Sequence, residues 1–283
     1  MLPRVNLVRT GPTDYLLFST DEVISKAIFD SGEWEPVNLL LANILCEGLE
    51  SPLALDVGAN LGAFSVPLAQ KLGQRNGLVY SFEPQRVVFY QLCANIFVNR
   101  LDNCMAYNMG VGDVAGTLEL PDNNYDSSNL GAYSLVPEYQ DLMNLKKAAP
   151  TALKHSVPIV TLDGFKFPRK VDFLKIDVEG MELQVLQGAR QLLQDSNYPP
   201  IMLEAWGFSW FKEQREALIA YLEGMGYQLF FINSSDAIAQ HSKSKRYVNF
   251  LVDPATNTLR YHVSDNSGVA PIAPTAAAAA TTA

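Results

Sequence analysis

The chain has 283 residues, which is long enough to bury a full hydrophobic core, and one main domain is the expected organisation. Hydrophobic residues make up 48% and charged residues 18%, as is typical of a soluble globular protein, and no run of about 18 apolar residues predicts a membrane span. The formal net charge of −9 argues against a nucleic-acid partner, because a broad phosphate-binding surface needs clustered Lys and Arg.

Residues 1–50 are interpreted as a helical lead-in that caps the sheet and one side of a ligand site. Gly32 separates two helical patterns, and the second of them follows Pro36. The acids Glu33 and Glu35 between these patterns are interpreted either as surface acids, which is the favoured alternative, or as residues that contact a ligand. The first residues lack the basic-then-apolar layout of a secretory signal, so a cytoplasmic location is expected.

Residues 53–64 are typical of a short apolar strand, a glycine turn and the start of a helix. Gly58 and Gly62 can adopt backbone angles closed to other residues, and the free N–H groups of the helix point toward the turn. The dinucleotide fingerprint G-x-G-x-x-G has a glycine where this sequence has Asn60, so a pyrophosphate is a poor fit. Asp56 adds a carboxylate at the end of the strand, which favours a cationic cofactor.

Residues 77–84 form a second predicted strand that ends at Glu83. A carboxylate at this position can accept both hydroxyls of a ribose, so it indicates an adenosine-containing ligand. NAD enzymes also carry an acid there, and the glycine turn is what favours S-adenosylmethionine over NAD. Residues 103–113 are expected as a third strand and turn, which would place Val111 and Gly112 near the adenine.

The alternation of strands and helices is interrupted over residues 114–165, which are interpreted either as a substrate lid or as a surface loop without a task. It returns at residues 171–180, where Lys175, Asp177 and Glu179 occur at period two and project to one side of a strand. Parallel strands are normally apolar on both faces, so these charges indicate mutual pairing, a substrate or a metal.

Residues 200–206 form the next predicted strand, and its last acid, Glu204, is expected near Asp177. Trp206 is interpreted either as a platform for a sugar ring or as a core residue. His241 follows in a polar loop and is a further candidate base, with a surface histidine as the alternative. Asp177 and Glu204 together could hold Mg²⁺, so a divalent metal stays open.

The sheet is expected to close with an antiparallel pair formed by residues 227–232 and 247–252, which brings the total close to seven strands. The main domain is assigned to residues 51–254. Residues 255–283 are rich in Ala, Thr and Pro and are expected to be a disordered tail.

Three separated segments resemble the FkbM family of S-adenosylmethionine-dependent methyltransferases. They are DVGANLG (56–62), FEP (82–84) and FLKIDVEGMELQVLQGA (173–189), which agree with the family in order and spacing. The likeness covers roughly residues 21–252. It implies an α/β fold of the class I Rossmann-like methyltransferase type, a mostly parallel seven-stranded sheet with helices on both faces. It also implies O-methylation of a hydroxyl on a sugar, glycan or natural product.

The resemblance assigns Asp56, Gly58, Asn60 and Gly62 to the methionine end of the cofactor and Glu83 to its ribose. In the same way it places a second group of residues, from the later strands, near the transferred methyl. That group is Asp177, Glu179 and Glu204.

A hydroxyl is a weak nucleophile, so methyl transfer benefits from a base that takes its proton. Asp177 or Glu179 is the hypothesised base, and Glu204 is expected to orient the acceptor. Three other functions are weighed against this one. They are an NAD-dependent oxidoreductase, a nucleic-acid methyltransferase, and a non-catalytic module that binds adenosylmethionine or a glycan. The identity of the acceptor and the oligomeric state are not predicted.

Overall fold

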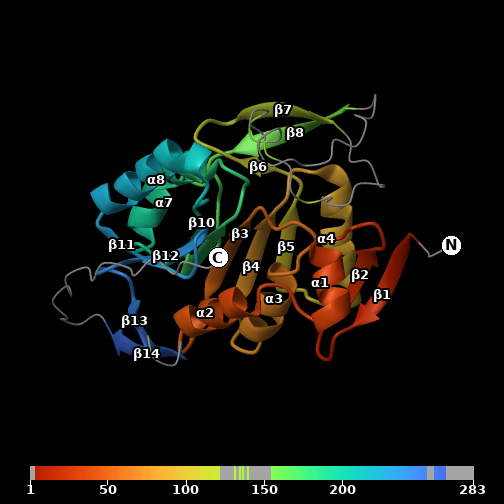
Figure 1. Ribbon diagram of the computed structural model, residues 1–283, viewed down its shortest axis with the longest axis horizontal. Helices are drawn as coiled ribbons and strands as arrows, with labels where there is room; N and C mark the ends of the chain where they lie inside the picture. The colour runs from red at the N-terminus through yellow and green to blue at the C-terminus, as the bar shows by residue number, and fades with distance from the viewer. Residues whose placement is uncertain are drawn as a thin grey trace.

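The computed structural model of the protein describes residues 4–121, 131, 134, 136, 139, 154–253 and 258–265. The centre of the fold is a seven-stranded sheet (Figure 1). Across this sheet the strands are β5 (Cys104–Tyr107), β4 (Leu78–Phe82), β3 (Leu53–Val57), β9 (Phe173–Ile176), β10 (Ile201–Glu204), β12 (Asp236–His241) and β11 (Tyr227–Phe231). Only β12 is antiparallel to its neighbours, so all the other strands point the same way. The expected α/β fold with a mostly parallel sheet is confirmed.

Both faces of the sheet are covered by helices. Successive side chains of each strand point to opposite faces, so each strand contributes to two cores. On β3, Leu53 and Leu55 pack into the core under one set of helices and Ala54 into the core under the other. The two sets are α2 (Pro36–Cys46), α3 (Ser65–Gly73) and α4 (Arg86–Val98) on one face and α6 (Glu182–Gln187), α7 (Arg190–Asp195) and α8 (Lys212–Gly224) on the other. A short 3-10 turn, Ser209–Phe211, leads into α8. No helix of the described residues is long and apolar enough to cross a membrane.

The N-terminal lead-in contains α1 (Ile24–Ser31) and α2, as the helical patterns predict, and also a hairpin that they do not. The hairpin strands are β1 (Val5–Arg9) and β2 (Asp14–Phe18), which pair antiparallel. Buried Asn95 of α4 joins the hairpin to the glycine turn: it accepts a hydrogen bond from the Leu16 N–H at 2.7 Å and donates one to the Leu61 carbonyl at 2.8 Å. The lead-in is therefore fixed to the same helix as the turn.

A second, three-stranded sheet flanks the segment that the sequence marks as an insertion. It consists of β6 (Gly110–Val111), β8 (Lys154–Val160) and β7 (Gly116–Pro121), in that order. Most of the connection between β7 and β8 lies outside the described residues, so the alternatives of a lid and a surface loop both stay open.

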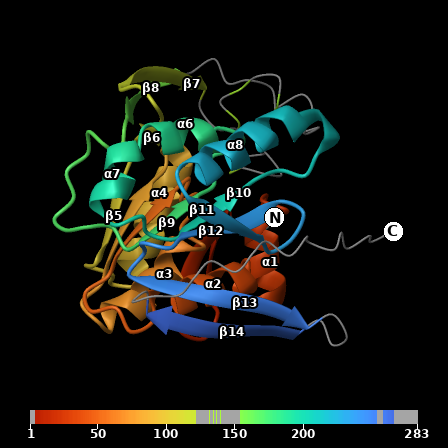
Figure 2. The same ribbon diagram turned by 90° about the vertical axis from the view of Figure 1, so that its left-hand side faces the viewer.

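Two predictions about the C-terminal part are wrong. The strand inserted between β10 and β11 is β12, whereas residues 247–252 belong to β13 (Arg246–Asp253), which pairs with β14 (Thr258–Asp265) in a separate hairpin. Figures 1 and 2 show this hairpin at the opposite end of the molecule from β7 and β8. The tail expected to be disordered from residue 255 thus contains a strand, and residues 266–283 lie outside the described part.

Replacing Asn95 with Ala should lower the free energy of unfolding by about 2 kcal/mol, because the buried Leu16 N–H and Leu61 C=O lose their partner. Urea unfolding of the variant measures this loss. Asn43→Ala is the matched control, since the Asn43 side chain donates to the Leu39 carbonyl of its own helix, a contact that joins no other element. Equal effects of the two substitutions would contradict the role given to Asn95.

Candidate active site

A pocket with a cavity volume of about 170 Å³ lies at the carboxyl ends of β3, β4, β9 and β10, where ligands bind in open α/β sheets. The pocket wall is formed mainly by the last residue of each of these strands or by the residues that directly follow it. The lead-in completes the wall with Trp34 and Glu35. The main polar residues in the wall are Glu35, Asn60, Glu83, Lys175, Asp177, Glu179 and Glu204.

The glycine turn after β3 is in direct contact with the turn after β9. Gly58 lines the pocket at φ 86°, and a Cβ on it would lie 1.7 Å from the carbonyl oxygen of Asp177. Gly62, at φ 90°, does not line the pocket; a Cβ there would lie 2.8 Å from Leu92 of α4. Gly62 is therefore required where the turn packs against α4. The predicted contact of Gly62 with the cofactor is corrected, because this residue supports the turn from outside the pocket wall.

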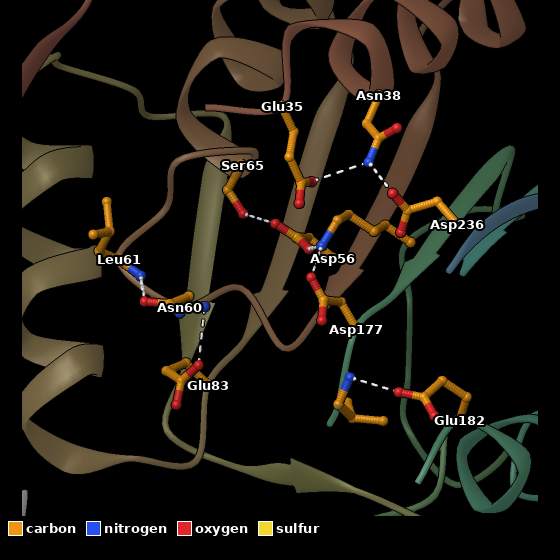
Figure 3. A network of polar contacts seen from close by, with 12 residues as sticks. Glu35, Asn38, Asp56, Asn60, Leu61, Ser65, Glu83, Asp177, Glu182 and Asp236 are labelled. Carbon is orange, nitrogen blue, oxygen red and sulfur yellow. Dashed lines mark hydrogen bonds and ion pairs between the residues drawn. The ribbon is translucent and has the colours of Figure 1, made fainter. Parts of the chain in front are cut away.

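Glu83 lies in the pocket wall with both carboxylate oxygens engaged by main-chain donors. Oε2 accepts the Asn60 N–H at 2.9 Å and Oε1 accepts the Gln85 N–H at 2.8 Å (Figure 3). Burial raises the pKa of Glu83 to about 8, and the two hydrogen bonds oppose that shift. Each oxygen keeps a second lone pair, so Glu83 can still accept the hydroxyls of a ribose.

Asp56 lies behind the pocket rather than in its wall. It is fully buried, and its Oδ2 accepts a hydrogen bond from Ser65 at the start of α3. Its Oδ1 has no hydrogen-bond partner and is 3.9 Å from the Lys175 ammonium. Burial raises the pKa of Asp56, and Lys175 opposes that shift. The predicted contact of Asp56 with the methionine end of a cofactor is corrected: the carboxylate supports α3 and Lys175.

Lys175 is the buried cation of the site. Its Nζ donates to Asp177 Oδ2 at 2.7 Å and lies 5.3 Å from the centre of the Phe64 ring. Two neighbouring carboxylates, Asp177 and Asp56, raise the pKa of Lys175 against the effect of burial. The ammonium therefore stays charged between these two acids.

Glu35 lies in the pocket wall, although the sequence interpretation favoured a surface position over contact with a ligand. It is largely buried and accepts a hydrogen bond from Asn38 at 3.1 Å. Burial raises the pKa of Glu35, and the charge of Lys175 lowers it. Its position directly before Pro36, the first residue of α2, is the same in either alternative, so the local sequence does not decide between them.

Glu179 and Glu204 complete the acidic wall. Burial and the nearby carboxylates of Asp177 and Glu182 raise the pKa of Glu179 to about 8. Burial and the same neighbouring charges hold the pKa of Glu204 well above its ordinary value. The Oε2 atom of Glu204 is buried and has no hydrogen-bond partner among the described residues. A hydrogen bond with the Trp206 side chain opposes the rise in the pKa of Glu204. The Oε2 atom is therefore the part of this carboxyl group that is left for a ligand.

Three non-glycine residues of the wall have left-handed backbone conformations. The φ angles are 46° at Glu35, 51° at Asn60 and 56° at Glu179. This region costs an L-residue roughly 1–2 kcal/mol, and residues held there collect at functional sites. These three backbone conformations therefore lower the stability of the fold, and they set the directions of three side chains of the pocket wall.

The remaining predicted site residues divide between the pocket and the core. Val111 lines the pocket, but Gly112 does not, because its carbonyl packs where a Cβ on Gly188 would lie, 2.0 Å away. Gly188 lies in the break between α6 and α7. Gly112 is thus a packing position, and Val111 stays a candidate for contact with an adenine.

Trp206 and His241 are both outside the pocket wall. Trp206 is 3% exposed and packs on Phe211 with ring centres 4.9 Å apart, so of the two alternatives the structure supports the core residue. His241 ends β12, opposite Tyr227, and stacks on Tyr198 at 4.1 Å. Because β12 is antiparallel to β10, its last residue lies at the far edge of the sheet. The prediction of His241 as a candidate base is therefore wrong.

A metal ion does not fit the acidic wall as it is arranged. Among the described residues, no group of three or more His, Cys, Asp or Glu is placed to hold one. The charge that a cation would supply beside Asp177 is already provided by Lys175. The predicted pairing of Asp177 and Glu204 around a metal ion is therefore not part of the proposed reaction.

S-adenosylmethionine does fit the pocket. The apolar side chains of Phe82, Met109 and Val111 share the pocket with Glu83, as an adenosine requires, and Gly58 leaves main chain exposed to a ligand. The carboxylates elsewhere in the wall suit a cofactor that carries two positive charges. The strand order, the single antiparallel strand and this pocket together define a class I S-adenosylmethionine-dependent methyltransferase.

The chain belongs to the FkbM methyltransferase family, because the family model described as the methyltransferase FkbM domain matches residues 56–229. Methyltransferase sdnD from Sordaria araneosa is 30% identical over 207 residues, which cover 63% of this chain and 74% of that protein.

Solved structures to which the chain is similar include an FkbM methyltransferase from Methylobacillus flagellatus, with a TM-score of 0.42 and 19% identity. The match covers 67% of this chain but only 44% of that one. An S-adenosylmethionine-dependent O-methyltransferase from Thermotoga maritima has a TM-score of 0.45 and 11% identity, over 95% of this chain and 74% of that one.

Replacing Glu83 with Ala should weaken S-adenosylmethionine binding about 30-fold, because two hydrogen bonds from ribose hydroxyls to the carboxyl group are lost. Calorimetric titration with the cofactor and its demethylated product measures the change. Glu119→Ala, which removes an exposed acid of β7, is the control and should bind as the wild type does. Unchanged affinity in Glu83→Ala would refute the ribose assignment.

The raised pKa of Glu83 also predicts how stability depends on pH. The folded protein holds this proton up to about pH 8, whereas the ordinary value is 4.5, so the associated stability is complete below pH 4.5 and is lost as pH rises through 8. Urea unfolding at pH 5, 7 and 9 should show a fall of a few kcal/mol (on the order of 3). Glu83→Gln cannot titrate and should lose less over the same range; parallel curves would contradict this origin.

Proposed function

We propose that the protein transfers a methyl group to a hydroxyl oxygen of a small, uncharged acceptor such as a sugar or another natural product. The observation that carries the proposal is the buried, unpartnered Oε2 of Glu204 in the pocket wall. Burial and the neighbouring carboxylates raise the pKa of Glu204 and so favour its neutral form, which can both donate and accept a hydrogen bond. A hydroxyl-bearing acceptor supplies the complementary groups.

S-adenosylmethionine, when bound, supplies a methyl group that is already activated by the positive sulfur. The protein then has to orient the acceptor and take the hydroxyl proton as the new bond forms. Glu179 suits the second task, because a base with a pKa of about 8 is partly ionised and still strongly basic near neutral pH. Asp177 has one oxygen committed to Lys175, which suits it to orienting charges rather than to receiving the proton.

The charges of the site favour a small uncharged acceptor over a nucleic acid. Glu35, Asp177, Glu179 and Glu204 share the pocket wall with a single cation, Lys175. Phosphate groups entering this wall would meet mainly carboxylates, and the net charge of −9 offers no compensating surface. A nucleic-acid acceptor is accordingly the second candidate, and its test is methyl incorporation into RNA or DNA under the same conditions.

Glu179→Gln should lower kcat at least about 100-fold while the Kd for S-adenosylmethionine changes little, because general base catalysis contributes 10²–10⁴-fold. The assay follows methyl transfer from labelled cofactor to a panel of sugars, glycosides and polyols. Glu213→Gln, at an exposed position of α8, is the control and should retain full turnover.

Two results would revise this proposal. Normal turnover in Glu179→Gln together with inactive Asp177→Asn would move the role of base to Asp177. Cofactor binding without turnover on any hydroxyl acceptor or nucleic acid would favour the non-catalytic binding module.

A further inference from the structure

The turn after β9 carries the proposed base and is held from behind by one side chain. Glu182, the first residue of α6, accepts hydrogen bonds at the same oxygen, Oε1, from the Val178 N–H at 3.1 Å and the Gly180 N–H at 3.2 Å. The contact with Val178 is drawn in Figure 3. The Gly180 N–H belongs to the peptide that directly follows Glu179, and the Val178 N–H belongs to the peptide between Asp177 and Val178. Glu182 therefore holds the main chain before and after Glu179.

The conformation at Glu179 needs such support. Its φ of 56° lies in the left-handed region that disfavours residues with a Cβ, and Gly180 follows at φ 98°. Gly180 has no room to rearrange, since a Cβ there would lie 2.7 Å from the Tyr139 ring and 3.0 Å from Trp206. A relaxed, right-handed Glu179 would turn its side chain away from the direction that the pocket requires.

Other contacts hold the turn at its remaining points. The Asp177 N–H donates to the Val57 carbonyl at 2.9 Å, and the Ser134 hydroxyl donates to the Glu179 carbonyl at 2.6 Å. The N–H groups of Val178 and Gly180 take no part in these two contacts, and both donate to Glu182.

Glu182 is placed to hold the turn and does not line the pocket. It is 2% exposed and is absent from the pocket wall. Among the ion pairs of the described residues, none includes Glu182, so its carboxyl group is matched by main-chain donors rather than by a cation. Its absence from the wall argues that it acts on a ligand through the turn.

We propose that Glu182 is a positioning residue for methyl transfer, whose carboxyl oxygen clamps the Val178 and Gly180 N–H groups and so holds Glu179 in the conformation that directs its carboxylate into the pocket. The proposal rests on the proposed function, in which Glu179 receives the proton of the acceptor. In this proposal the first residue of α6 orients Glu179, a base in the turn that precedes the helix.

The test compares two variants of nearly equal size. Glu182→Gln keeps an oxygen that can accept both N–H groups, and Glu182→Met fills the same space without a comparable acceptor. Glu182→Met should lower kcat about tenfold or more, with the acceptor KM and the cofactor Kd within about threefold of wild type. Amide hydrogen exchange at Val178 and Gly180 should accelerate in Glu182→Met. Glu182→Gln should retain at least about half of the turnover and the amide protection.

Each other outcome overturns the clamp. A Glu182→Gln variant as defective as Glu182→Met would mean that charge matters rather than hydrogen bonding. Unchanged exchange at Val178 and Gly180 in Glu182→Met would mean that these bonds do not hold the turn. Loss of cofactor binding in Glu182→Met would reduce Glu182 to a general structural role.

Two further arrangements keep the test decisive. Should Glu182→Met not fold, Glu182→Asp replaces it, since one fewer methylene draws the acceptor away from both N–H groups. Should the wild type turn over no hydroxyl acceptor, the proposed function fails, while amide exchange in the same variants still decides whether the clamp exists.

Discussion

The contact between the main chain of Gly58 and the carbonyl of Asp177 is the constraint on which the site depends. With no space for a Cβ at Gly58, the turn after β3 lies directly against the turn after β9. The first turn carries the features expected to bind a cofactor, and the second carries the acids expected to work on its methyl group. A single close approach of two backbones therefore brings the two halves of the chemistry together, and the parallel order of β3 and β9 makes it possible.

Charge balance is the second condition. Asp56 and Asp177 share one buried ammonium, Lys175, whereas no ion pair among the described residues includes Glu179 or Glu204. Burial and mutual repulsion raise the pKa values of the latter two, so the acids of the wall are not equivalent. The site can therefore hold ionised and neutral carboxyl groups side by side, which a proton transfer within a hydrogen-bonded acceptor complex requires.

Much of the sheet and the pocket could be predicted from the sequence. The strands β3, β4, β9 and β10 are short apolar runs ended by glycine or an acid, and parallel strands bring such ends to one edge. Local patterns could not reveal the depth of Asp56, because a charged residue at a strand end is consistent with either face. They also could not reveal Glu35, whose left-handed conformation at the start of α2 follows from packing of the lead-in. His241 was misplaced because the direction of β12 is set by its neighbours in the sheet.

Trp34 and Glu35 precede residue 56, where the match to the shared family domain begins. One wall of the pocket is thus made by chain outside the matched domain. The same wall is joined to the glycine turn, because Trp34 packs against the cluster that contains Leu61 and Ala63. A change in the connection between α1 and α2 therefore alters the pocket wall and the support of the glycine turn together.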